Sequence, residues 1–227
     1  MRLLIYGGTF NPPHLGHADA LSCAAAALKA DRMLVVPAGI PPHKALAEGS
    51  PSSEERLRLC ELAFEKADVT PMELLREGKS YTVDTLREIS RDNPEAELYF
   101  LIGTDMLLYM EHWHDFREIF SLCTLAALPR AEGDMPEIEQ YAAYLRETYG
   151  AQIEIIPKTP LPMDSTALRA ALPQRGGADI GADAHMRLLR LASDAFVVLR
   201  RDPEGNADIF IHAIPPLCEN RGLGLAH

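Results

Sequence analysis

Short apolar runs alternate with helix-forming segments along most of this chain. Five of the runs are predicted to be strands, at residues 3–6, 33–36, 98–102, 123–128 and 153–156. The segments between them favour helices, since residues 18–30 are rich in alanine and 137–149 has an amphipathic pattern. Strands that alternate with helices are typical of a doubly wound parallel sheet. We therefore predict an α/β fold built on such a sheet.

Three shorter stretches also have predictable local structure. Ser52 and Glu55 have the spacing of a capping box, which predicts a helix from about residue 53. Residues 69–75 are predicted to be extended. Thr82 is a good N-cap for another helix, which should end before Asn93-Pro94.

Length and composition exclude several classes of function. At 227 residues the chain is long enough for one α/β domain and a small appendage. The net charge is −11 and no block of Lys or Arg occurs, so we expect no nucleic-acid partner. No apolar run approaches the roughly 20 residues that a membrane span needs. Met1-Arg2 leads directly into the first strand rather than into a signal peptide, so we expect a cytoplasmic protein with no membrane partner.

The cysteines point to neither disulfides nor a zinc site. Cys23, Cys60, Cys123 and Cys218 are far apart in the sequence, lie in apolar surroundings, and form no C-x-x-C pair. We therefore expect reduced thiols within the core.

The end of the first strand carries the strongest chemical signal. Gly7-Gly8-Thr9 permits a sharp turn, and His14 and His17 lie three residues apart at the entry to the next helix. Free backbone N–H groups and two imidazoles then converge at the positive end of the helix dipole. This arrangement predicts an anion site, and the natural anion is phosphate. Two histidines near a helix start are, alone, more often incidental, so other segments must support the site.

Two later segments have groups suited to phosphate. Lys44 projects from a loop stiffened by Pro41-Pro42, just after the second predicted strand. Ser165, Thr166 and Arg169 begin a further helix and combine hydroxyls, free N–H groups and a guanidinium. Taken alone, Lys44 could equally be a solvated lysine, and an ordinary helix cap is the simpler interpretation of the second segment.

Other candidates for binding follow strands or begin helices. Asp105 comes just after the strand at 98–102, where an aspartate commonly accepts from a ribose hydroxyl or binds a metal; it could instead cap the following helix. The helix start at Thr82 is suited to a carboxylate ligand. Trp113, the only tryptophan, would by itself be a core residue, and the histidines on either side of it, including His114, make a poor chelate.

Several of these segments together resemble one family. Residues 7–17, GGTFNPPHLGH, resemble the first signature of the nucleotidyltransferase superfamily, whose H/T-x-G-H motif holds a nucleotide triphosphate. They are most similar to the bacterial nicotinate-nucleotide adenylyltransferases of NAD synthesis. Residues 41–44 (PPHK), 80–86 (SYTVDTL) and 163–169 (MDSTALR) resemble further motifs of that family. The last departs from the family's Ile-Ser-Ser-Thr-x-Ile-Arg pattern at Asp164, which adds negative charge close to a triphosphate.

The resemblance implies both a fold and a reaction. It implies a Rossmann-like fold of the nucleotidyltransferase type over residues 1–172, with a C-terminal segment at 173–227 packed on the same domain. It also implies transfer of the adenylyl group of ATP to nicotinate mononucleotide, which forms nicotinate adenine dinucleotide and pyrophosphate by direct in-line attack. Mg²⁺ would bridge the substrate phosphates rather than sit in a protein cage.

The resemblance further implies a role for each candidate residue. His14 and His17 would act on the phosphates as catalytic residues. Gly7, Gly8, Thr9, Lys44, Ser165, Thr166 and Arg169 would bind ATP and its phosphates. Asp105 would contact a ribose or a metal-linked group. Thr82, Trp113 and His114 would contact the nicotinate, with the indole stacked on the pyridine ring.

Three alternatives remain at this point. A sister transferase acting on nicotinamide mononucleotide or phosphopantetheine would keep both phosphate motifs, although Thr82 and Trp113 argue against it. A class I aminoacyl-tRNA synthetase has a similar histidine motif, but this chain is small, acidic and without a Lys-rich second signature. A nucleotide sensor without turnover is disfavoured by the intact His14 and His17, although Asp164 keeps it open. A homo-oligomer is neither indicated nor excluded.

The resemblance weakens beyond residue 172. In this tail we predict a helix at 185–193 and strands at 196–199 and 209–211, with a turn at 202–206 between the strands. No motif in it indicates chemistry.

Overall fold

The computed structural model describes residues 1–42, 46, 50–161 and 165 in full, and the backbone of 187–191, 195–201 and 207–212. The chain divides into two compact units, residues 1–174 and 175–227. The larger unit carries every predicted site residue. The boundary predicted at residue 172 stays a prediction, since residues 166–186 lie outside the described part of the chain.

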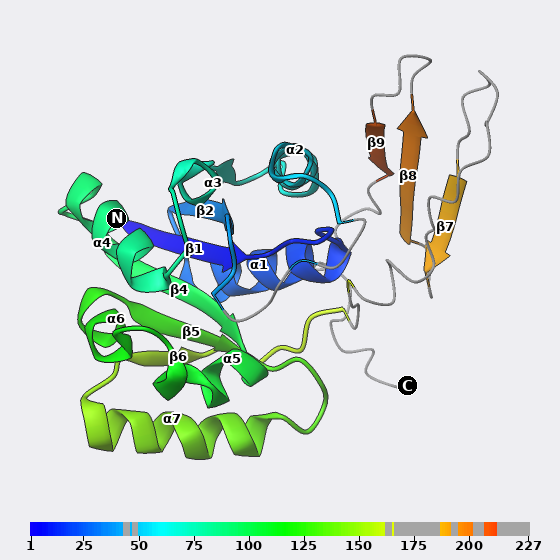
Figure 1. The fold of residues 1–227 in the computed structure, drawn as a ribbon. Coiled ribbons are helices and arrows are strands. Elements are labelled where there is room, and N and C mark those ends of the chain that lie inside the picture. Colours follow the sequence, from blue (N-terminus) through cyan, green and yellow to red (C-terminus); the bar gives the residue numbers. More distant parts are fainter. Residues whose placement is uncertain are drawn as a thin grey trace, which may run out of the picture. The chain divides into compact units, whose positions relative to one another are not determined.

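The larger unit is built on a six-stranded sheet (Figure 1). The strands are β1 (Arg2–Gly8), β2 (Arg32–Pro37), β3 (Asp68–Val69), β4 (Glu97–Gly103), β5 (Thr124–Leu128) and β6 (Ile153–Ile155). Their order is β3-β2-β1-β4-β5-β6, and all five pairings are parallel. The predicted doubly wound fold is therefore confirmed. The strand order reverses between β1 and β4, and ligands of such sheets bind at the carboxyl ends of the strands beside that reversal.

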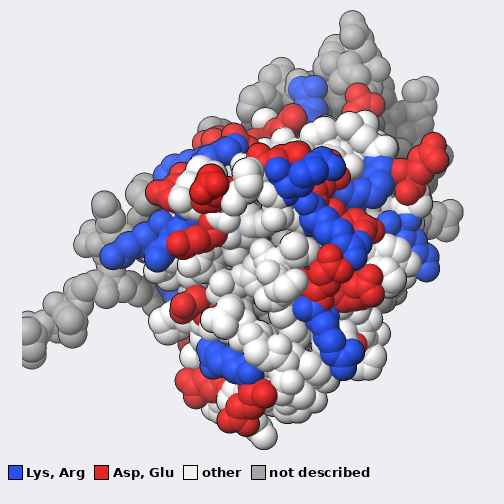
Figure 2. Space-filling model, turned by 90° about the vertical axis from the view of Figure 1, so that its left-hand side faces the viewer, with Lys and Arg blue, Asp and Glu red and all other residues white. Residues whose placement is uncertain are grey.

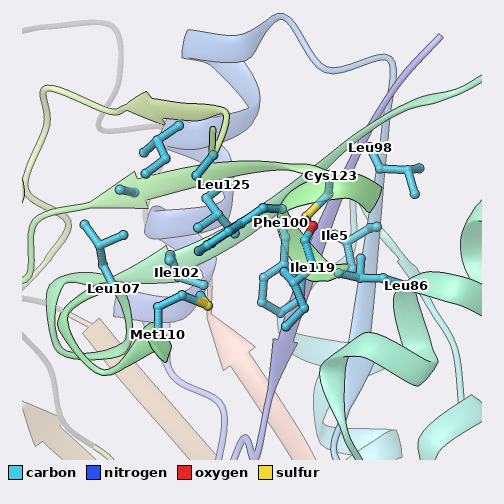
Figure 3. Close-up of a cluster of buried hydrophobic side chains, with 14 of the residues drawn as sticks. Ile5, Leu86, Leu98, Phe100, Ile102, Leu107, Met110, Ile119, Cys123 and Leu125 are labelled. Atoms are coloured by element: carbon cyan, nitrogen blue, oxygen red, sulfur yellow. Dashed lines mark hydrogen bonds between the residues drawn. The ribbon is translucent and has the colours of Figure 1, made fainter. Parts of the chain in front are cut away.

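Helices cover both faces of the sheet because the inner strands are apolar on both sides. They are α1 (Leu15–Leu28), α2 (Ser53–Ala63), α3 (Met72–Leu75), α4 (Thr82–Asp92), α5 (Thr104–Leu108), the 3₁₀ turn η1 (Met110–His112), α6 (Phe116–Leu122) and α7 (Met135–Tyr149). In β1, Leu3 and Ile5 face the core beneath α4 to α7, whereas Leu4 faces the core beneath α1 and α2. Figure 3 shows the first of these cores, with Leu107 and Met110 packed toward Ile102.

Several details of the larger unit differ from the predictions. The capping box of Ser52 and Glu55 is confirmed, with both reciprocal hydrogen bonds present. The extended stretch predicted at 69–75 was wrong beyond Val69, because Met72–Leu75 forms the short helix α3. Thr82 is the first residue of α4 rather than its N-cap, which is Tyr81. Cys23, Cys60 and Cys123 are buried free thiols, as predicted, and Cys218 lies outside the described residues.

The smaller unit contains a three-stranded antiparallel sheet in the order β7-β8-β9. Its strands are β7 (Arg187–Leu191), β8 (Ala195–Arg201) and β9 (Ala207–His212). The helix predicted at 185–193 is wrong: residues 187–191 pair with β8, and an apolar stretch as short as this one, RLLRL, fits a strand as well as a helix. The turn predicted at 202–206 lies outside the described residues.

Charges on the visible face of the molecule are mixed. Figure 2 shows Lys and Arg side chains interspersed with Asp and Glu side chains rather than gathered in one patch. Among the described residues, several charges form ion pairs, as in Arg87 with Asp84 and Glu118, or Arg32 with Asp68. Within the described residues, no helix has the length and hydrophobicity to cross a bilayer.

Candidate active site

The turn from β1 into α1 brings His14 and His17 together. His14 is the N-cap of α1, and the two histidines form a reciprocal capping box. The backbone N–H of His17 donates to His14 Nδ1 over 3.3 Å, and the backbone N–H of His14 donates to His17 Nδ1 over 3.2 Å. The two rings stack with centroids 3.6 Å apart. A capping box of this kind satisfies two helix N-terminal donors, and here the side chains that provide it are imidazoles.

This hydrogen bonding determines which nitrogen of each neutral ring can donate. Because Nδ1 accepts in both rings, the proton of a neutral imidazole resides on Nε2. Burial lowers the pKa of His17 well below the ordinary value of 6.5, and the nearby His14 and Arg130 lower it further. His17 is therefore a neutral imidazole at neutral pH in the absence of ligand, with an Nε2–H group available as a donor.

Aromatic packing beneath His17 orients its ring. Phe10 lies edge-on to His17 with centroids 5.3 Å apart, and Phe10 also contacts Tyr6 and Phe64 at 5.3 Å. Phe10 has a φ of 44°, in the left-handed region that a bulky residue rarely adopts. The buried ring, 3% exposed, is therefore held against the histidine by a strained backbone turn.

The turn after β1 is joined to the turn after β2 by Arg56 of α2. Its guanidinium donates to the carbonyl oxygens of Thr9 (2.9 Å), Ala38 (2.6 Å) and Gly39 (3.3 Å). Arg56 is fully buried, and no carboxylate of the described residues forms an ion pair with it. Burial accordingly lowers its pKa. The hydroxyl of Ser53 is a further acceptor, at 3.4 Å, and because all these acceptors are neutral, the charge of Arg56 remains beneath the two turns.

A second cation reaches the site from the end of β5. Arg130 Nε lies 3.0 Å from Asp105 Oδ1, and its charge lowers the pKa values of both His17 and Tyr6. A Cβ atom on Gly103 would lie 2.7 Å from Arg130 Nε, so the absence of a side chain at Gly103 leaves room for the Arg130 side chain to reach Asp105. Asp134 accepts from the N–H of Arg130 and thereby holds the loop that carries it.

Sequence reasoning assigned no role to Arg56 or Arg130. Arg56 lies within an ordinary amphipathic helix, and its main partners are backbone carbonyls. Because every residue has such a carbonyl, the sequence does not indicate which ones bind Arg56. For Arg130, the only available signal was its place just after a strand, where ligand-binding residues of α/β proteins gather.

The second predicted phosphate segment is described only at Ser165. The Ser165 hydroxyl donates to the carbonyl oxygen of Pro12 over 2.9 Å, which brings it against the turn that precedes His14. Asp19 of α1 supports the same approach, because its carboxylate accepts from the N–H of Leu161 over 3.0 Å. Lys44, Asp164, Thr166 and Arg169 lie outside the described residues.

The predicted nicotinate contacts lie near Phe100 of β4 and at the start of α4. The indole of Trp113 lies edge-on to Phe100 with centroids 6.1 Å apart, and a Cβ built on Gly7 would touch the same ring at 3.3 Å. His114 packs on Tyr81, the residue before Thr82, with centroids 4.4 Å apart. Phe100 thus neighbours both Trp113 and Gly7 of β1, and His114 neighbours the start of α4.

A buried polar network links the start of α4 to the turn after β2. The Gly39 N–H donates to Ser80 Oγ over 3.1 Å, and the Thr85 hydroxyl donates to the buried carboxylate of Glu73 over 2.6 Å. Burial raises the pKa of Glu73, whereas hydrogen bonds from Thr85 and Ser80 oppose that rise. A Cβ on Gly39 would come within 2.2 Å of the Glu73 carbonyl oxygen, so only glycine fits there.

Metal ligands do not gather in this region. Across the described residues, no group of three or more His, Cys, Asp or Glu side chains could hold a metal ion. Asp105, predicted to contact a ribose or a metal-linked group, forms an ion pair with Arg130.

The fold and the histidine turn together define a nucleotidyltransferase: a parallel sheet whose strand order reverses beside β1, with the His14-x-x-His17 turn at the carboxyl end of that strand. The cytidylyltransferase-like family model matches residues 5–171. A probable nicotinate-nucleotide adenylyltransferase of a Synechococcus strain is 36% identical over 78% of this chain and 87% of its own length. One from Listeria innocua is 38% identical over 56% of this chain and 68% of its own. The chain therefore belongs to the nicotinate-nucleotide adenylyltransferase family.

Solved structures share the fold. The nicotinic acid mononucleotide adenylyltransferase of Plasmodium falciparum, complexed with NaAD, has a TM-score of 0.60 and 17% identity. That comparison covers 78% of this chain and 86% of the other. The same enzyme complexed with APC has a TM-score of 0.59. At this level of identity the likeness concerns the fold alone.

Proposed function

We propose that this chain transfers the adenylyl group of ATP to nicotinate mononucleotide, forming nicotinate adenine dinucleotide and pyrophosphate. The observation that carries the proposal is the reciprocal histidine cap at the end of β1. Both Nδ1 atoms are used in this cap and both Nε2 atoms are not, in a chain whose family relatives carry this activity in their names.

The reaction needs little from the protein beyond positioning and charge. An oxygen of the mononucleotide 5′-phosphate attacks the α-phosphorus of ATP, the bond from that phosphorus to the bridging oxygen breaks, and pyrophosphate leaves. The attacking phosphate is already an anion, so no proton has to be removed. Catalysis of phosphoryl transfer rests on alignment and on stabilising charge that spreads over the phosphate oxygens.

His14 and His17 are placed to bind the α- and β-phosphates through Nε2–H. A neutral donor that is already aligned costs no reorganisation as the transition state forms. Arg130 and the buried charge of Arg56 favour anions at the same edge of the sheet. Lys44, Ser165, Thr166 and Arg169 would bind the remaining phosphate oxygens, with Gly7, Gly8 and Thr9 allowing their close approach.

Mg²⁺ would enter this reaction bound to the nucleotide phosphates. Because the acids of the described site are few and Asp105 is paired with Arg130, the residues present do not form a cage for it. When bound, it would neutralise phosphate charge. Asp105 would then accept a hydrogen bond from a ribose hydroxyl.

Thr82, Trp113 and His114 would select the pyridine. The indole offers a flat surface for the ring, and N–H groups at the start of α4 favour a carboxylate over an amide. The proximity of Trp113 to Phe100, and of His114 to Tyr81, supports one pocket made from α4 and the segment after η1.

A turnover assay tests the proposal. The purified protein is given ATP and Mg²⁺ with nicotinate mononucleotide or with nicotinamide mononucleotide, and pyrophosphate release is followed. Faster release with the acid is expected. Equal kcat/KM for the two would replace this assignment with a broader mononucleotide adenylyltransferase, and no release with either would refute the activity.

A further inference from the structure

One carboxylate next to the proposed pyridine pocket binds three tyrosines. Glu111, in the middle of η1, accepts from the hydroxyls of Tyr141 (2.6 Å), Tyr144 (3.1 Å) and Tyr149 (2.5 Å). All three tyrosines belong to α7, so a single side chain of η1 is tied to one helix by three hydrogen bonds. These bonds lower the pKa of Glu111, which keeps its carboxylate ionised at neutral pH. Hydrogen bonds to an ionised acceptor are about twice as strong as neutral ones.

The tyrosine helix also contacts the element that follows Trp113. Tyr149 packs edge-on against Phe116 of α6 with centroids 5.2 Å apart, and the Arg117 guanidinium lies 5.2 Å above the Tyr149 ring. Trp113 therefore lies in a short connection that α7 holds at both ends, through Glu111 before it and α6 after it. Met110 adds a buried anchor for η1 within the core (Figure 3).

The indole of Trp113 packs against the core beneath α4 to α7 but has no polar anchor among the described residues. Its Nε1 atom is buried, and no acceptor among the described residues binds it. The ring contact with Phe100 is edge-on at 6.1 Å, and the Trp113 backbone N–H donates to the Met110 carbonyl oxygen over 3.0 Å. Because the indole makes no hydrogen bond with the described residues, its position depends on this apolar packing and on the backbone of η1. Glu111 is the side chain that ties this backbone to α7.

We propose that Glu111 is a positioning residue for Trp113, acting through its three tyrosine partners, and that it thereby sets the affinity for the pyridine substrate. The second half of this inference rests on the proposed function; the first half does not. Glu111 touches no substrate in this proposal. Loss of its charge should leave the phosphate site at His14 and His17 unchanged, since that site lies on the turn after β1.

Fluorescence tests the positioning directly, because Trp113 is the only tryptophan in the chain. The variants are Glu111→Gln, which keeps the shape and removes the charge, and the double variant Tyr141→Phe/Tyr149→Phe, which keeps the rings and removes two donors. Glu139→Gln is the control, since it makes the same charge change at an exposed position of α7. Acrylamide quenching and anisotropy are measured without substrates. Both test variants should show quenching increased about twofold and lower anisotropy, and the control neither.

Steady-state kinetics test the consequence. Glu111→Gln should raise KM for nicotinate mononucleotide about tenfold, which one lost charge-assisted hydrogen bond can account for. KM for ATP should stay within about twofold. Unchanged fluorescence in both test variants would overturn the positioning role, and equal increases in both KM values would overturn its link to the pyridine. If Glu111→Gln fails to fold, the fluorescence of the double variant Tyr141→Phe/Tyr149→Phe decides whether the positioning role holds. If the protein proves inactive on both mononucleotides, the fluorescence result still stands alone.

Discussion

The imidazoles of His14 and His17 cap one helix together, each accepting the backbone N–H of the other through Nδ1. This relationship gives the pair two tasks. The Nδ1 atoms stabilise the start of α1, whereas Nε2 takes no part in the cap and is the atom proposed to bind phosphate. A substitution at either position therefore affects stability through the loss of Nδ1 and catalysis through the loss of Nε2, and the two effects can be separated.

Replacement of His17 by alanine should lower kcat by about a hundredfold or more, because a donor to transition-state charge is worth on the order of 3 kcal/mol. Stability should fall by about 1 kcal/mol, the usual cost of a lost cap. His17→Asn separates the two, since its amide oxygen can replace Nδ1 but no group replaces Nε2–H. We expect the asparagine variant to unfold like the wild type in urea and to turn over like the alanine variant. Near-normal turnover would remove His17 from the mechanism.

The pH dependence of stability should also report on His17. Its pKa is depressed in the folded state relative to about 6.5 when unfolded, mainly by burial. Below pH 6.5 the unfolded chain therefore binds a proton that the native protein does not, so stability falls as pH decreases through this range. The slope is at most about 1.4 kcal/mol per pH unit for one proton. Urea denaturation at several pH values should show a shallower slope for His17→Asn; parallel slopes would contradict this assignment.

Removal of the buried guanidinium should destabilise the protein. In Arg56→Met, the Thr9, Ala38 and Gly39 carbonyls lose their donor, and unsatisfied buried groups cost on the order of 1–3 kcal/mol. Arg56→Lys should recover the lost stability only in part, because an ammonium retains the charge but not the planar fork of donors. Arg91→Met is the control, since Arg91 forms an exposed pair worth about 0–1 kcal/mol. Equal denaturation midpoints for Arg56→Met and wild type would refute this role.

Selectivity between acid and amide should depend on Thr82 more than on Trp113. Oriented N–H and hydroxyl donors favour an anion by about 1–3 kcal/mol, roughly tenfold to a hundredfold. Thr82→Ala should reduce the preference for nicotinate mononucleotide in kcat/KM. Trp113→Ala should weaken both mononucleotides alike and leave ATP affinity nearly intact. The two variants thus control for each other, and an unchanged acid-to-amide ratio in Thr82→Ala would place the selectivity elsewhere.

Local patterns in the sequence were sufficient for most of the fold and for the centre of the site. The apolar runs of the inner strands β1, β2, β4 and β5 are covered on both faces, so their composition alone identifies them, and the edge strand β6 is recognisable from its isoleucines although Glu154 is exposed. His14 and His17 are three residues apart at a helix start, so their proximity follows from helical geometry. The capping box of Ser52 and Glu55 is local in the same sense. Each of these depends on contacts within a few residues of chain.

Other features depend on contacts between distant segments and required the tertiary structure. Arg56 binds carbonyls 47 and 18 residues away, and backbone acceptors carry no sequence signature. Glu111 meets Tyr141 across 30 residues, and only the packing of η1 on α7 decides that. The strand β7 could not be distinguished from a helix because pairing with β8, rather than local propensity, selects the extended form. Sequence determined most of the helices and strands and the histidine turn. Long-range packing decided which charges surround that turn, because such packing depends on all the elements at once.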